Sequence, residues 1–145
     1  MTLKPNELEL HHWDEWLSSG VDLSIVSLNV TSLSGDLIYD YLCYSPQLER
    51  TNTGRLKRGI IQRYEHAKAD GWWCRGIDLL MWKPMLWGCF KPDFPCTNNF
   101  DKLGKTIKYE HPLKTPTRVL LLQVPDEIWE KVSQRYSKPL TAFGV

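Results

Sequence analysis

The sequence predicts an α+β fold: a helical N-terminal part, followed by a small, antiparallel sheet with a C-terminal helix. Three observations support this class. Apolar residues recur at helical spacing as far as about residue 69. From Gly71 to Pro95 that spacing is lost, because Gly, Pro and Asp interrupt the chain every few positions. Two strand-like runs and a closing helix follow.

The chain of 145 residues is long enough to bury its own core. We therefore expect a single domain over 1–145. It would combine an acidic helical subdomain (1–49) with a second part (50–145) that holds a basic helix, an aromatic loop and strand region, and the closing helix. Aromatic residues make up 12% of the chain, so Trp, Tyr and Phe should form much of the core.

Cap and stop residues predict three short helices in the N-terminal third. Asn6 can cap the first, which ends at Gly20 in a left-handed conformation. Asp22 can cap the second helix. The third starts at Ser34 and is stopped by Pro46.

The remaining elements follow from apolar periodicity. A fourth helix is predicted from about Arg55 to Ala69, with Gly59 weakening it by about 1 kcal/mol relative to alanine. Residues 106–110 alternate like an exposed strand, and residues 117–124 resemble a strand covered on both faces. A last helix should begin with Pro125 in its first turn and run through Tyr136.

The segment from Gly71 to Pro95 holds four of the seven tryptophans and two of the four cysteines. We expect it to be the hinge between the helical and sheet parts, with Trp72, Trp73 and Trp87 mostly buried. Its last six residues contain two prolines, which restricts them to a sheet edge or to a position outside the sheet.

The net charge of +1 hides a strong division along the chain. Residues 1–49 carry one basic and eight acidic side chains, whereas residues 50–118 carry fourteen basic and six acidic ones. Either the two parts pair with each other, or a basic surface faces an anionic partner.

Residue spacing argues against a catalytic or metal centre. Fourteen and six residues separate Cys74, Cys89 and Cys96, and neither CxxC nor HxxxH occurs, so no metal and no cofactor are predicted. His11 and His12 are assigned a surface or helix-cap role. Cys74 precedes Arg75, a cation of the kind that stabilises a nucleophilic thiolate. Its other neighbour is Trp73, which indicates that the Cys74 side chain packs in the core instead. The chain is predicted not to be an enzyme and to carry free thiols.

Cations interleaved with aromatic rings are the remaining signal. Such a surface binds single-stranded nucleic acid, because rings stack on bases while cations follow the phosphates. The alternative is that the tryptophans form the core. The cations that suggest this surface are Arg55, Lys57, Arg58, Arg63, Arg75, Lys83, Lys91 and Lys108.

Several spaced blocks also resemble a known family. They are SLSGD (32–36), the run from Gln62 to Gly76, WGCFKPDFP (87–95) and IKYEHPLKTPTRV (107–119). Over about residues 20–136 the chain resembles the N-terminal region of cyanobacterial plasmid replication proteins that carry a primase-like Toprim domain. The sequence holds neither a TEG nor a DxD motif, so the resemblance confers no primase activity on it.

The resemblance implies a role in binding phosphate for three positions. Lys108 lies in a segment similar to the strand before the Toprim domain of bacterial primases, where a basic surface guides the template. By position, Arg118 and Lys91 join it as expected phosphate contacts. The predicted nucleic-acid contacts are thus Arg55, Lys57, Arg58, Arg63, Arg75, Lys91, Lys108 and Arg118.

Two functions are compatible with these observations. The first is a noncatalytic nucleic-acid-binding module of plasmid replication, with DNA, preferably single-stranded, or replication proteins as partners. The alternative is an adaptor or inhibitor of replication or defence machinery, which would expose Trp72, Trp82 or Trp87 in one patch or use its acidic part to mimic nucleic acid. The polar N-terminus predicts a cytoplasmic protein without a membrane partner. No oligomeric state is predicted.

Overall fold

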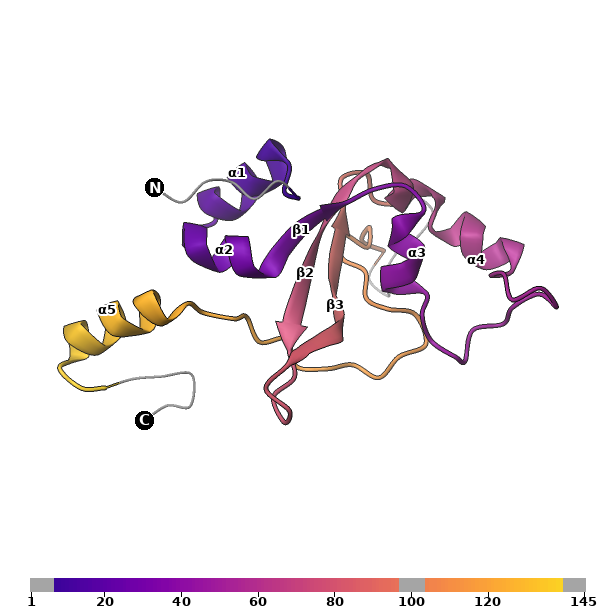
Figure 1. Ribbon diagram of the computed structural model, residues 1–145. Coiled ribbons are helices and arrows are strands. Elements are labelled where there is room, and N and C mark those ends of the chain that lie inside the picture. Colours follow the sequence, from indigo (N-terminus) through magenta and orange to yellow (C-terminus); the bar gives the residue numbers. More distant parts are fainter. Residues whose placement is uncertain (1–6, 97–103, 140–145) are drawn as a thin grey trace.

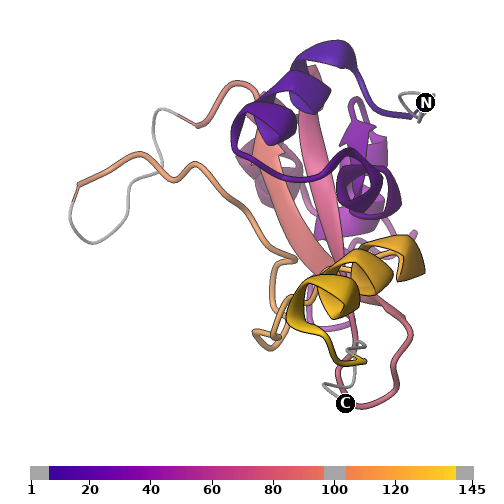
Figure 2. The same ribbon diagram turned by 90° about the vertical axis from the view of Figure 1, so that its left-hand side faces the viewer.

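A computed structural model describes residues 7–96 and 104–139 and contains a three-stranded antiparallel sheet between two groups of helices (Figure 1). The strands are β1 (Val30–Leu33), β2 (Gly71–Ile77) and β3 (Pro84–Pro92), with β2 in the centre. The fold is α+β, as predicted. In Figure 2 the N-terminal helices and the C-terminal helix lie in front of the strands.

Some helix boundaries match the predicted caps and others do not. The first helix begins at Leu10, and the third begins at Leu37, not at Ser34, and ends at Leu42, before Pro46. Gly20 follows the first helix with a φ of +86°, and the Asp22 carboxylate accepts the Ser24 N–H at the start of the second. Pro125 immediately precedes the last helix. Asn6 lies outside the described residues. The helices are α1 (Leu10–Ser18), α2 (Leu23–Asn29), α3 (Leu37–Leu42), α4 (Arg58–Arg63), the 3-10 helix η1 (Glu65–Ala69) and α5 (Asp126–Tyr136).

Within 7–96 and 104–139, none of these helices has the length and apolar character needed to cross a bilayer.

Each face of the sheet has its own core, and neighbouring tryptophans of β2 supply one ring to each. Trp72 packs on the face covered by α1 and α2, with Val26, Val30 and Cys74. Trp73 packs on the opposite face, in a core whose other members are Leu33, Ile38, Leu42, Cys43, Leu48, Tyr64, Ala67 and Phe90. Successive side chains of a strand point to opposite faces, so the Trp-Trp pair fills both cores at once.

The segment from Gly71 to Pro95 is therefore not a hinge, because it forms the central hairpin of the sheet. Its burial is as predicted: Trp72, Trp73 and Trp87 are all buried. Pro92 ends β3, which is an edge strand, and Pro95 lies beyond the strand, so both prolines are accommodated as predicted.

The predicted strands after residue 104 were wrong. Residues 106–110 meet the sheet through one bridge, Phe90 to Glu110, and residues 117–124 through another, Ile77 to Leu121. The run 117–124 is not covered on both faces, since Val119 is 64% exposed. The third strand is instead β1, from the part predicted to be wholly helical.

The predicted fourth helix is divided in two. It starts at Arg58 instead of Arg55 and ends at Arg63, and η1 continues from Glu65. Tyr64, between them, is 2% exposed in the Trp73 core. Burial of this ring coincides with the change from α to 3-10 geometry.

We predict that Gly88→Ala lowers the free energy of unfolding by about 1–3 kcal/mol, the usual cost of overpacking a core. A Cβ atom at this position would lie 2.5 Å from Trp73 Cζ2 and 2.6 Å from the Cys74 carbonyl oxygen. Gly59→Ala is the matched control, because a Cβ there meets no atom within 4 Å and should raise stability by up to about 1 kcal/mol. Urea denaturation of both variants measures this difference, and equal stabilities would contradict the packing described.

Candidate functional site

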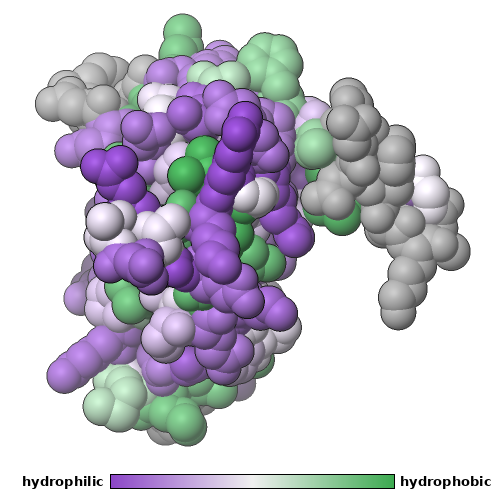
Figure 3. All heavy atoms as spheres, turned by 90° about the vertical axis from the view of Figure 1, so that its right-hand side faces the viewer, coloured by the Kyte–Doolittle hydropathy of each residue, from purple (hydrophilic) through white to green (hydrophobic). Residues whose placement is uncertain are grey.

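Residues 50–63, which we call the basic arm, carry five basic side chains and no acidic one. All five are exposed. Figure 3 views the molecule from the side on which α4 lies in Figure 1, and hydrophilic residues dominate that face. Four of the eight predicted contacts belong to this arm: Arg55, Lys57, Arg58 and Arg63.

Contacts within the arm fix some of its cations and leave others unpaired. The Arg50 guanidinium donates to the carbonyls of Cys43 (3.1 Å) and Gly54 (3.2 Å), so it shapes the loop. Lys57 Nζ lies 3.1 Å from a carboxylate oxygen of the exposed Glu49. Among the residues that the structure describes, Arg55 and Arg58 form no ion pair, so both remain available to an anion.

The other four predicted contacts come from separate elements and do not join the arm. Lys91 forms an ion pair with Glu15, and Arg118 forms one with Asp78. Arg75 is the exposed residue of β2, and Lys108 is exposed in the segment after residue 104. Lys91 and Arg118 thus already have carboxylate partners, whereas Arg75 and Lys108 are accessible.

The acidic and basic parts of the chain pair with each other in several places. Lys68 Nζ lies 3.0 Å from an Asp36 carboxylate oxygen, in addition to the pairs of Lys57 and Lys91. The first interpretation of the charge division, pairing between the two parts, is therefore confirmed for these cations, whereas the basic arm keeps a surplus of positive charge.

Most tryptophan rings of the central hairpin are used for packing. Trp82 is 37% exposed, but Trp72 and Trp87 are 7% exposed each, so the three rings do not form an exposed patch. Two tyrosines are better placed to meet a ligand. Tyr41 and Tyr44 line an open groove together with Arg75.

Burial keeps the thiols of Cys43, Cys74 and Cys89 protonated. Removal from solvent raises the pKa of Cys74 to about 12, and those of Cys43 and Cys89 to about 11. The neighbouring Arg75 side chain is exposed to solvent and does not offset the effect of burial on the Cys74 pKa. A thiol with so high a pKa is not an activated nucleophile.

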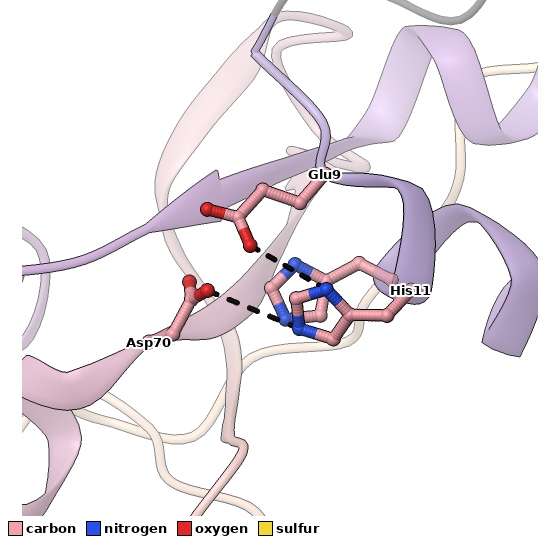
Figure 4. A group of neighbouring side chains, drawn as sticks. Glu9, His11 and Asp70 are labelled. Atoms are coloured by element: carbon pink, nitrogen blue, oxygen red, sulfur yellow. Dashed lines mark ion pairs between the residues drawn. The ribbon is translucent and has the colours of Figure 1, made fainter.

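A cluster that the sequence did not predict lies where α1 meets the open end of the hairpin. We call Glu9, His11, His12, Asp70 and Asp93 the histidine–carboxylate cluster. His12 is fully buried, contrary to the surface or cap role expected for it. One Asp93 oxygen lies 2.8 Å from His12 Nε2 and the other 2.7 Å from His11 Nε2. Figure 4 shows the side chains of Glu9, His11 and Asp70 pointing toward one another.

The carboxylates of the cluster have unusual proton affinities. Burial and a hydrogen bond with the Glu9 carboxyl raise the pKa of Asp70 to about 6. Burial also disfavours the charged form of Asp93, but hydrogen bonds from His11 and His12 outweigh it and lower the Asp93 pKa. The hydrogen bond to Asp93 in turn raises the pKa of His11. Asp70 therefore keeps a proton to a higher pH than an ordinary aspartate, whereas the environment favours a charged Asp93 beside a protonated His11.

Comparison with known proteins gives one informative relative. An uncharacterized protein of the cyanobacterium Picosynechococcus sp. is 46% identical to this chain over 132 residues. The match covers 89% of this chain but 13% of the relative, so the chain is similar to a small part of a much longer protein. No protein-family model matches the chain, and no solved structure gives a significant match.

We predict that Cys43, Cys74 and Cys89 resist a thiol-specific reagent at pH 8 in the native protein. Their raised pKa values keep them protonated at that pH, and only the thiolate reacts. All three should react once urea unfolds the chain. Mass spectrometry of peptides labelled before and after unfolding measures the reactivity of each cysteine. Rapid labelling of Cys74 in the native protein would contradict the prediction and make Cys74 a candidate nucleophile again.

Proposed function

We propose that this chain is a noncatalytic nucleic-acid-binding module related to plasmid replication proteins and active in the cytoplasm. The basic arm carries the proposal, because it places five exposed cations and no acid in residues 50–63. Such a surface attracts the phosphate backbone without regard to base sequence. Arg55 and Arg58 are the side chains most available for phosphate contacts.

Aromatic side chains near the other accessible cations favour a single strand over a duplex. Tyr41 and Tyr44 line the groove that holds Arg75, and Tyr109 is 51% exposed beside Lys108. Unpaired bases stack on such rings at about 1–3 kcal/mol each, which paired bases do not allow. Glu7 and Asp40 also line the groove, so we assign the main electrostatic contribution to the basic arm.

The link to replication has a different support. It rests on the resemblance of the four spaced blocks to primase-associated plasmid replication proteins, and 46% identity to a much longer cyanobacterial protein is compatible with it. In this proposal, any catalytic step belongs to other domains of such a protein, and the present segment holds the nucleic acid.

We predict that the chain binds a fluorescent single-stranded oligonucleotide at low salt, with an affinity that falls as salt rises. Arg55→Gln combined with Arg58→Gln should weaken binding and reduce the slope of log affinity against log salt by about 0.7 for each lost phosphate contact. Fluorescence anisotropy at several salt concentrations measures both quantities.

The control for this experiment is Lys131→Gln combined with Arg135→Gln, which removes two exposed cations from α5 and should leave binding unchanged. A labelled duplex of the same sequence tests strand preference. Absence of binding at low salt, or an unchanged salt slope in the arm variant, would refute the proposal.

A second candidate function, protein interaction, is favoured by the connection between β2 and β3. Asp78 accepts the backbone N–H groups of Leu80 and Met81 and so fixes a turn with apolar side chains on its outer side. Leu80 is 89% exposed and Leu86 is 74% exposed. Exposed apolar residues grouped in this manner are typical of an interface with another protein.

For this alternative we predict that Leu80→Asp combined with Met81→Asp reduces the recovery of partner proteins from a cyanobacterial extract without changing DNA affinity. Leu10→Asp on α1 is the control, since Leu10 is equally apolar and 63% exposed but lies on another element. Quantitative mass spectrometry of captured proteins provides the measurement. Equal recovery by both variants and the unmodified chain would argue against an interface at this turn.

A further inference from the structure

We propose that the histidine–carboxylate cluster binds a divalent first-row transition metal ion, for which Zn²⁺ is the probe. This inference is independent of nucleic-acid binding, because none of the five residues belongs to the basic arm. It departs from the prediction of no metal, which rested on the absence of CxxC and HxxxH spacing, since the imidazole and carboxylate donors here come from separate segments.

The donor atoms already converge. One ligand atom from each of Glu9, His11, His12 and Asp70 lies within 4.8 Å of the others. In a tetrahedral site with metal–ligand bonds of about 2.0–2.2 Å, the ligand atoms are about 3.3–3.6 Å apart. Side-chain movements of about 1 Å at Glu9 and His11, both exposed, would therefore complete the coordination sphere.

All three strands support the cluster from one face of the sheet. Asp70 immediately precedes β2 and Asp93 follows β3, and the Asp93 N–H donates to the Asp70 carbonyl (2.9 Å). The two aspartates are thus cross-strand neighbours. Ser32 of β1 completes the arrangement, with its Oγ 2.7 Å from His12 Nδ1.

The contact with Ser32 orients His12 as a metal ligand requires. Ser32 Oγ accepts the Glu9 backbone N–H at 2.8 Å and can also accept a proton from His12 Nδ1. In that tautomer the Nε2 lone pair of His12 can coordinate an ion, in exchange for the present 2.8 Å hydrogen bond between Nε2 and Asp93. Metal-bound histidines almost always donate their other ring N–H to a fixed acceptor in this manner.

The charge of the cluster also favours a cation. Three carboxyl groups surround two imidazoles, and Glu9 and Asp70 lie close enough to share a hydrogen bond. Without a cation, protons must offset the repulsion between these carboxylates, which agrees with the raised pKa of Asp70. A divalent ion could replace those protons, and Asp93 would supply a further oxygen donor beside both rings.

The donor set selects the class of ion. Imidazole nitrogen suits zinc, iron, copper and nickel, whereas Mg²⁺ and Ca²⁺ prefer oxygen ligands alone. Two imidazoles with two or three carboxylates therefore favour Zn²⁺ over Mg²⁺. The ion would fasten the start of α1 to the open end of the β2–β3 hairpin.

The test is isothermal titration of the chelator-treated full chain with Zn²⁺, Co²⁺ and Mg²⁺, together with thermal unfolding. We expect one saturable site for Zn²⁺ and Co²⁺, a rise in Tm with added Zn²⁺, and no comparable effect of Mg²⁺. His11→Gln and Asp70→Asn should each weaken Zn²⁺ binding by at least about tenfold. These side chains are chosen because fully buried His12 is needed for packing.

Two controls separate this site from other sources of binding. His111→Gln removes an exposed histidine outside the cluster and should leave the affinity unchanged. Cys89→Ser combined with Cys96→Ser excludes ligation by thiols, which the Co²⁺ absorption spectrum would also reveal. Circular dichroism confirms that each variant is folded. The proposal is overturned if Zn²⁺ does not saturate a site, or if folded His11→Gln and Asp70→Asn variants bind it as tightly as the unmodified chain.

Discussion

The alternation of Trp72 and Trp73 across β2 is the constraint on which the rest of the molecule depends. Each ring belongs to a different core, so α1 and α2 can pack on one face of the sheet while α3 and η1 pack on the other. A slip of one residue in β2 would exchange the two faces and disrupt both cores together. Gly88 helps to prevent this slip, because its missing side chain leaves the space that the Trp73 ring occupies.

This use of the aromatic residues limits where the protein can meet a partner. Rings that fill the cores cannot also stack on bases or insert into another protein, so the richest aromatic segment of the sequence is mainly structural. The two accessible surfaces on which the proposals rest lie on different elements: the cations of the basic arm and the apolar turn between β2 and β3. The nucleic-acid and protein-interaction hypotheses can therefore be tested by separate variants.

Local signals in the sequence predicted some helix boundaries and missed the starts of α1, α3 and α4 by about a turn. Gly20, Asp22 and Pro125 marked helix boundaries because caps and left-handed turns depend on residues close in sequence. Strand pairing depends on distant partners and was predicted poorly. β1 has four residues and gave no signal of its own. The apolar run 117–124 suggested a strand, but Leu120 and Leu122 only pack against the edge of the Trp72 core.

The histidine–carboxylate cluster illustrates the same limit at a functional level. Its members come from residues 9–12, 70 and 93, with Ser32 behind them, and no spacing motif connects these positions. They meet because Asp70 and Asp93 extend the pairing of Gly71 with Pro92 by one residue, on the face that also carries Trp72. The register that separates the two tryptophans therefore also brings both aspartates beneath α1. Core packing and the proposed metal site are consequences of one alignment of β2 with β3, which sequence spacing alone does not reveal.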